Sequence, residues 1–167
     1  MIRMLEIEGH DPLFDEVEKL IKEVFPSMDL AERLSFLAYR HQSGLRGRIL
    51  AKLSGVSSLS NIWAAINDNK EICGTTGIYT CADDAHEADW LSWFCVAPNQ
   101  RGQGISKKLI EFSIDLARKR SKKFLRLYTS DDPNEAVAQL LYERYGLKVV
   151  KTEKYSSGTI IYRELKL

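Results

Sequence analysis

The sequence lacks the features that mark several classes of protein. It has three cysteines and three histidines in 167 residues, with no C-x-x-C pair, so we expect neither a disulfide scaffold nor a bound metal. No apolar run approaches the roughly 20 residues that a membrane-spanning helix needs. The acidic, interrupted start MIRMLEIEGHD does not resemble a secretory signal. We therefore expect a soluble, cytoplasmic protein without a membrane partner.

Charge of one sign is also lacking. The 24 lysines and arginines nearly balance 23 acidic residues, which leaves a formal charge of +1 and does not favour a nucleic-acid partner. Apolar residues make up 44% and charged residues 28%, an ordinary globular balance. Since no linker or repeat divides the chain, we predict a single domain over residues 1–167.

Hydrophobic periodicity predicts alternating helices and strands around one mixed α/β sheet. The expected strands are residues 1–7, 62–66, 72–81, 89–96, 124–128, 147–155 and 159–167. The expected helices are one after Asp11 and Pro12, one over Leu30–Arg40, one from Ile105 into a basic run, and one from Pro133 to Tyr145. A short helix is expected within residues 41–58. The pattern is that of a sheet of about seven strands flanked by about four helices.

The segment after the apolar strand 89–96 is the most informative part of the sequence. Pro98 and the glycines at 102 and 104 form a tight loop, and a helix begins directly behind them. The first turn of a helix has main-chain N–H groups without partners and a partial positive charge. Glycines allow a bulky anion to approach closely, and Arg101 and Lys107 add positive charge. The segment therefore has the properties of a diphosphate cradle, although a glycine-rich turn with basic surface residues would look the same.

The spacing within this loop excludes two common nucleotide motifs. The third glycine of G-x-G-x-x-G would fall on Lys107, and no glycine precedes Lys-Ser or Lys-Thr as a P-loop requires. The loop instead resembles R-x-x-G-x-[GA], the pyrophosphate loop of the GCN5-related N-acetyltransferases (GNAT), with Ser106 at the last small position. Downstream, residues 141–147 resemble the family motif L-Y-x-x-x-G-F, with Leu147 in place of Phe.

The resemblance implies a GNAT-like fold with a mostly antiparallel sheet, and acetyl-CoA as the co-substrate. It implies transfer of an acetyl group to a primary amine by direct attack through a tetrahedral intermediate. Tyr142 matches the tyrosine that donates a proton to the departing thiolate. The residues matched to cofactor contacts are Phe94, Cys95 and Val96 on the strand, Arg101, Gly102, Gln103, Gly104, Ile105 and Ser106 in the loop, and Asn134.

Glu87 and Asp89, at the start of the central strand, are the candidates for a base that deprotonates the amine. In that position they would favour a cationic acceptor, either a small molecule or a peptide amine. The alternative is that both belong to a solvated acidic turn. Two other functions stay open: a catalytically silent module that binds acyl-CoA, and a non-enzymatic interaction domain. Residues 159–162 are expected to form an edge strand that could pair in a homodimer.

Overall fold

The computed structural model describes residues 1–28, 30–42, 44–54, 56, 58–156 and 158–167. Over these residues, seven strands form one sheet in the order β1-β2-β3-β4-β5-β7-β6. The strands are β1 (Arg3–Ile7), β2 (Ser58–Ile66), β3 (Ile72–Thr80), β4 (Ala88–Val96), β5 (Phe124–Ser130), β6 (Lys148–Tyr155) and β7 (Gly158–Lys166). The helices are α1 (Phe14–Val24), α2 (Leu30–Arg40), α3 (Leu45–Leu53), α4 (Ile105–Lys119) and α5 (Ala136–Arg144).

Neighbouring strands run antiparallel except for β4 and β5, which are parallel. The predicted mixed, mostly antiparallel sheet and the predicted order of elements are therefore confirmed. Within the described residues, no helix is long and apolar enough to cross a membrane.

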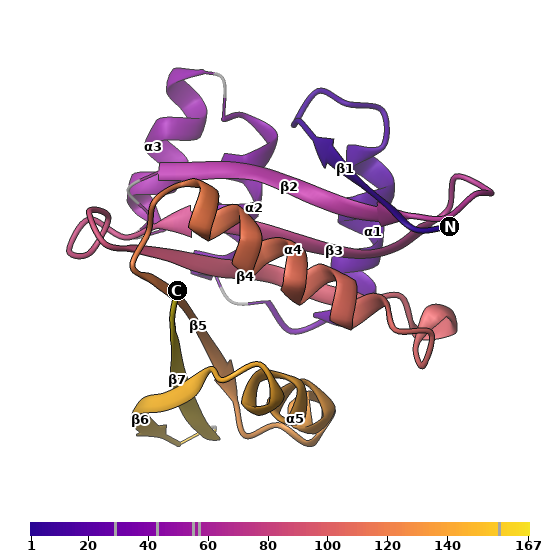
Figure 1. Ribbon diagram of the computed structural model, residues 1–167. Helices are drawn as coiled ribbons and strands as arrows, with labels where there is room; N and C mark the ends of the chain where they lie inside the picture. The colour runs from indigo at the N-terminus through magenta and orange to yellow at the C-terminus, as the bar shows by residue number, and fades with distance from the viewer. Residues whose placement is uncertain (29, 43, 55, 57, 157) are drawn as a thin grey trace.

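Helices cover both faces of the sheet (Figure 1), and the two larger hydrophobic clusters of the described residues lie between helices and strands. The first packs apolar residues of α1 and α2, such as Val17 and Phe36, against β1, β2 and the second half of β4. The second packs Ile110 and Ile114 of α4 and Tyr142 of α5 against β5. Helix α1 buries one face because its apolar side chains recur at helical spacing. The second half of β4 is thus covered from both sides, which makes it the central strand that its apolar sequence predicted.

Some boundaries differ from the expectation. Strand β2 begins at Ser58, and β5 extends to Ser130. Helix α1 begins at Phe14, because the Asp11 carboxylate accepts a hydrogen bond from the Leu13 N–H (2.8 Å) in a turn ahead of the helix. A short 3₁₀ helix, Pro133–Glu135, precedes α5. These shifts concern element ends, where local pattern is least informative.

The expected edge strand at residues 159–162 is wrong. These residues belong to β7, which is hydrogen-bonded to β5 on one side and to β6 on the other. The edges of the sheet are β1 and β6. The chain enters β7 from a hairpin after β6, but β7 inserts between β6 and β5, so order along the chain gives the wrong neighbour.

Candidate active site

Strands β4 and β5 pair over only part of their length. Ala88, Asp89 and Trp90 pair with residues 124–126 of β5, and within the described chain no later residue of β4 pairs with β5. Strand β5 instead continues along β7 as far as Ser130, and Figure 1 shows the two strands diverging. One edge of β4 beyond Trp90 therefore has main-chain N–H and C=O groups that an extended ligand can pair with.

A β-bulge interrupts β4 at this split. Ser92 lies opposite Gly77 and Cys95 lies opposite Thr75, so two residues of β4 oppose one residue of β3. Trp93, inside the bulge, has a φ of 48°, a conformation that costs a bulky residue about 1–3 kcal/mol. A strained residue of this kind persists only where the surrounding structure holds it, and such residues cluster at functional sites.

The ladder between β3 and β4 fixes which main-chain groups of β4 are available. The Ala97 N–H donates to the Cys73 carbonyl oxygen (2.9 Å). Since hydrogen-bonded and non-hydrogen-bonded pairs alternate in an antiparallel ladder, the main-chain groups of Cys95 face β3. The main-chain groups of Phe94 and Val96 face the opposite side, where β5 no longer pairs with β4.

The loop between β4 and α4 is open to a ligand. Gly102 and Gly104 have φ values of 77° and 76°, in the left-handed region that favours glycine. A Cβ at either position would meet no atom within 4 Å, so the space beside both glycines is open. Helix α4 begins directly after Gly104, and its first N–H groups lie at this corner. The corner therefore has the open main chain that the predicted anion cradle requires.

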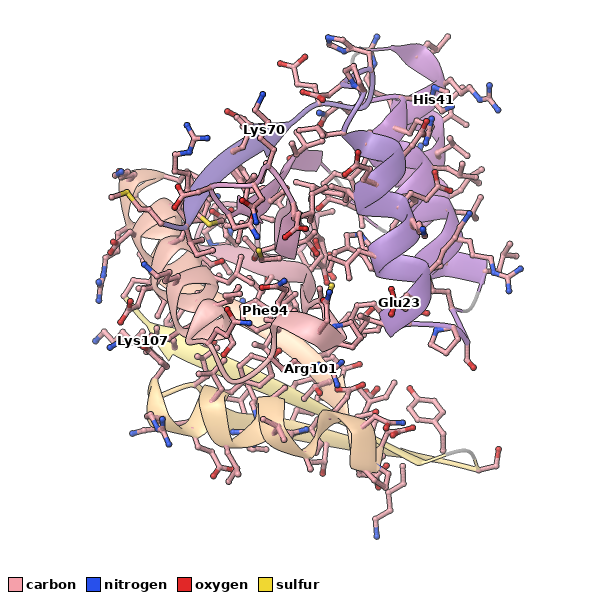
Figure 2. The ribbon with its side chains drawn as sticks, turned by 90° about the vertical axis from the view of Figure 1, so that its right-hand side faces the viewer. Glu23, His41, Lys70, Phe94, Arg101 and Lys107 are labelled. Atoms are coloured by element: carbon pink, nitrogen blue, oxygen red, sulfur yellow. The ribbon has the colours of Figure 1, made fainter. Side chains whose placement is uncertain are left out.

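Side chains around this corner have different roles. Figure 2 shows Phe94 and Arg101 near the carboxyl end of β4 and Lys107 on the first turns of α4. Arg101 and Gln103 are exposed, and Ser106 is half-buried. Ile105 is buried against Ala65, Cys73 and Leu109, so only its main chain can face a ligand.

Tyr142 of α5 closes the opposite side of the split. Its side chain is buried, and its ring lies 5.9 Å from the ring of Phe94, measured between centroids. Burial, the largest influence, raises the pKa of Tyr142 above its usual range, so the hydroxyl is protonated at neutral pH. The packing of α5 against β4 therefore brings Tyr142 and Phe94 together, although they lie far apart in the sequence.

Cys95 is not a nucleophile in this setting. Burial is the main reason that its pKa is raised to about 11, while Arg101 lowers it and Glu23 raises it. The thiol is therefore neutral at physiological pH, and a neutral thiol is a poor nucleophile. Both charged residues lie close enough to act on this thiol, and Figure 2 shows Glu23 on α1 and Arg101 in the loop after β4.

A family model described as an acetyltransferase (GNAT) domain matches residues 58–149, which include the split, the loop and all of α5. The chain belongs to the GNAT acetyltransferase family. A curated relative, GCN5-related N-acetyltransferase 6, chloroplastic, from Arabidopsis thaliana, is 34% identical over 68 residues. That match spans 41% of this chain and 23% of the length of the relative.

Solved GNAT structures share the fold of this chain. A protein assigned to the GNAT family from Desulfovibrio desulfuricans aligns with a TM-score of 0.76 and 16% identity, over 99% of both chains. A GNAT acetyltransferase from Elizabethkingia anophelis, solved with acetyl-CoA bound, aligns with a TM-score of 0.65 and 19% identity, over 99% of this chain and 98% of that one. At such identities the likeness establishes the fold.

The two carboxylates predicted as bases lie elsewhere in this GNAT domain. Asp89 is fully buried, and its oxygens accept from Arg120 at 2.7 Å and 3.3 Å, with the Lys122 Nζ at 3.8 Å. Phe94 is five residues further along β4, roughly 16 Å away in an extended strand. Glu87 pairs with Arg126 at 3.2 Å. Neither carboxylate is brought to the split, and a fully buried Asp89 does not belong to a solvated turn either.

These acidic residues instead hold the two strands together where they still pair. Arg126 of β5 binds Asp84 at 2.6 Å, Glu87 at 3.2 Å and Glu164 of β7 at 2.7 Å. Trp90 of β4 donates its indole N–H to Asp84 as well (2.8 Å). The cluster joins the start of β4 to β5 and β7. Because most of the negative charge is paired within the protein, Glu87 and Asp89 do not support a cationic acceptor, and the charge of the acceptor stays a prediction.

Asn134 lies in the 3₁₀ helix before α5 with an exposed side chain, and its main-chain N–H donates to Asp132 (2.8 Å). Sequence reasoning missed Thr75 of β3, which contacts the bulge directly. The available signal was the pair Thr75 and Thr76 between two glycines in a mostly apolar strand, because buried hydroxyls need partners.

Proposed function

We propose that this chain transfers the acetyl group of acetyl-CoA to a primary amine by direct attack of the amine on the thioester. The single observation that carries the proposal is the split between β4 and β5, which ends at an open helix N-terminus. One extended ligand with a diphosphate fits both features at once. Acetyl-CoA supplies an activated acyl group, and the chain supplies the means to bind, orient and polarise it.

The loop is suited to the diphosphate. The main-chain amides from Gln103 to Ser106 lie at the positive end of α4. The exposed side chain of Arg101 adds a positive charge. Because a Cβ at Gly102 or Gly104 would point into open space, the main chain there can be approached closely. We propose that Asn134 contributes a further contact from the start of α5.

The edge of β4 is suited to the pantetheine arm. The N–H and C=O groups of Phe94 and Val96 face away from β3, so the arm can pair with β4 as an added strand. The main-chain groups of Cys95 face β3. This pairing orients the strand so that the main-chain groups of its two neighbours face the pantetheine arm. We propose that the N–H of Phe94, at the bulge, donates to the thioester carbonyl oxygen as negative charge develops there.

Tyr142 is suited to stabilise the departing sulfur. Its hydroxyl stays protonated because burial raises its pKa. Complete transfer of that proton to a thiolate is uphill, since a thiol has a pKa of about 8.5 and a phenol about 10 before any shift. We therefore propose a hydrogen bond from Tyr142 to the sulfur that strengthens as the C–S bond breaks.

A thiol-release assay tests the proposal. Acetyl-CoA is offered with small primary amines, polyamines and peptides that have free N-termini, and released CoA is measured. We expect turnover with at least one amine class, dependent on Tyr142. Binding of acetyl-CoA without thiol release across the panel would favour the catalytically silent module, and failure of CoA to raise the melting temperature would favour an interaction domain.

A further inference from the structure

We infer that Thr75 is a positioning residue for the acyl transfer, because it fixes the direction of the Phe94 N–H. The inference rests on the proposed function, in which that N–H polarises the thioester carbonyl. Thr75 lies on β3, belongs to neither sequence motif, and makes its contacts from beneath the bulge of β4.

The side chain of Thr75 is bonded to the bulge itself. It is fully buried, and its hydroxyl donates to the main-chain carbonyl oxygen of Trp93 at 2.7 Å. The same hydroxyl oxygen lies 3.2 Å from the Cys95 thiol. Trp93 is the residue with the positive φ, and its carbonyl belongs to the bulge, where the ladder with β3 shifts register. The hydroxyl therefore takes the place of a ladder partner for that carbonyl.

Peptide geometry carries this contact to the reacting atoms. The carbonyl of Trp93 and the N–H of Phe94 belong to one planar, trans peptide unit, so they point in opposite directions. Holding the carbonyl towards Thr75 on β3 directs the Phe94 N–H away from β3, into the split that β5 leaves. Rotation of this peptide would move the donor off the position where the oxyanion forms, and such a misalignment affects the chemical step more than binding.

Thr76 provides a matched control in the neighbouring position. It is also fully buried, and its hydroxyl hydrogen-bonds to Ser113 of α4 at 2.9 Å. Successive side chains of a strand point to opposite faces, so Thr76 cannot reach the bulge carbonyl as Thr75 does. Replacing either threonine by valine removes one buried hydroxyl, but only one of the two changes affects the Trp93–Phe94 peptide.

Steady-state kinetics with an amine from the thiol-release screen test the inference. We expect Thr75→Val to lower kcat about 10-fold or more while KM for acetyl-CoA stays within about threefold, because transition-state contacts are lost and ground-state contacts remain. Thr75→Ser keeps the hydroxyl and is expected to keep kcat within about threefold of the wild type. Thr76→Val should lower the melting temperature similarly but leave kcat within about twofold. Thr75→Ala is a second variant without the hydroxyl, and it provides the same test if Thr75→Val fails to fold.

The amide signal of Phe94 gives a readout that does not need turnover. In the wild type, acetyl-CoA should shift this signal further than CoA does, because only the thioester offers a carbonyl oxygen. The difference should vanish in Thr75→Val and persist in Thr75→Ser and Thr76→Val. An equal kcat in Thr75→Val and Thr76→Val, or a Phe94 shift that survives in Thr75→Val, overturns the role of Thr75 alone. Loop amides that respond to neither acetyl-CoA nor CoA overturn the proposed function, and the role of Thr75 with it.

Discussion

Gly104 combines a backbone conformation that favours glycine with open space beside its main chain, and replacing it by alanine tests the two properties separately. With φ at 76°, an alanine there loses roughly 1–2 kcal/mol of stability, because its Cβ crowds the following carbonyl oxygen in the left-handed conformation. For a chain of this length, each kcal/mol corresponds to a fall in melting temperature of about 2–4 °C. The added methyl group meets no atom of the protein within 4 Å, so no packing change accompanies the strain. It lies instead in the space beside the loop from which a diphosphate would approach.

We therefore expect Gly104→Ala to weaken CoA binding at least about tenfold, which is 1.4 kcal/mol. Gly146→Ala is the matched control. Gly146 follows the end of α5 and has a φ of 80°, and a Cβ there would lie at an ordinary contact distance of 3.5 Å from the side chain of Leu165. Calorimetry measures the dissociation constant of CoA and the melting temperature of both variants. Equal losses of stability with tenfold weaker binding in Gly104→Ala alone support the cradle. Wild-type affinity in Gly104→Ala, or equal loss of affinity in both variants, would refute it.

Three further substitutions test other parts of the account. Tyr142→Phe keeps the ring against Phe94 but removes the hydroxyl, so kcat should fall about tenfold or more while the dissociation constant of acetyl-CoA is unchanged; wild-type turnover would defeat the role. Asp89→Asn leaves Arg120 and Lys122 without their buried negative partner, which should cost about 3–5 kcal/mol in urea unfolding. The folded fraction should still turn over near the wild-type rate, and a selective loss of kcat would restore Asp89 as a base. Glu153 has its pKa lowered to about 2 by Lys151, Tyr155 and Tyr162, so its contribution to stability is present above the unfolded value of 4.5 and is lost as pH falls from 4.5 towards 2. Glu153→Gln should flatten acid unfolding in that window, and an unchanged pH profile contradicts the ion pair.

The local parts of the site could be predicted from the sequence. Gly102, Gly104 and the helix after them follow one another within a few residues, so the sequence alone predicts a tight loop that leads into a helix N-terminus. The element order also follows from periodicity, because helices and strands repeat their apolar residues at different intervals. Tyr142 needed more: its motif indicated a role, but only the packing of α5 against β4 brought its ring to Phe94.

The long-range parts could not be predicted. Glu87 and Asp89 stand at the start of an apolar strand, and nothing local indicates that Arg120, Lys122 and Arg126 meet them there. The β-bulge depends on the register between β3 and β4, which a single strand does not reveal. The insertion of β7 between β5 and β6 likewise depends on pairing across the sheet.

Residue-resolved hydrogen exchange with and without CoA tests the central claim most directly. The main-chain groups of Phe94 and Val96 face the split, while those of Cys95 face β3. CoA should therefore slow exchange at Phe94 or Val96 and at the first amides of α4, and leave Cys95 as it was. Uniform slowing along all of β4, or no change at either the strand or the loop, would contradict the account.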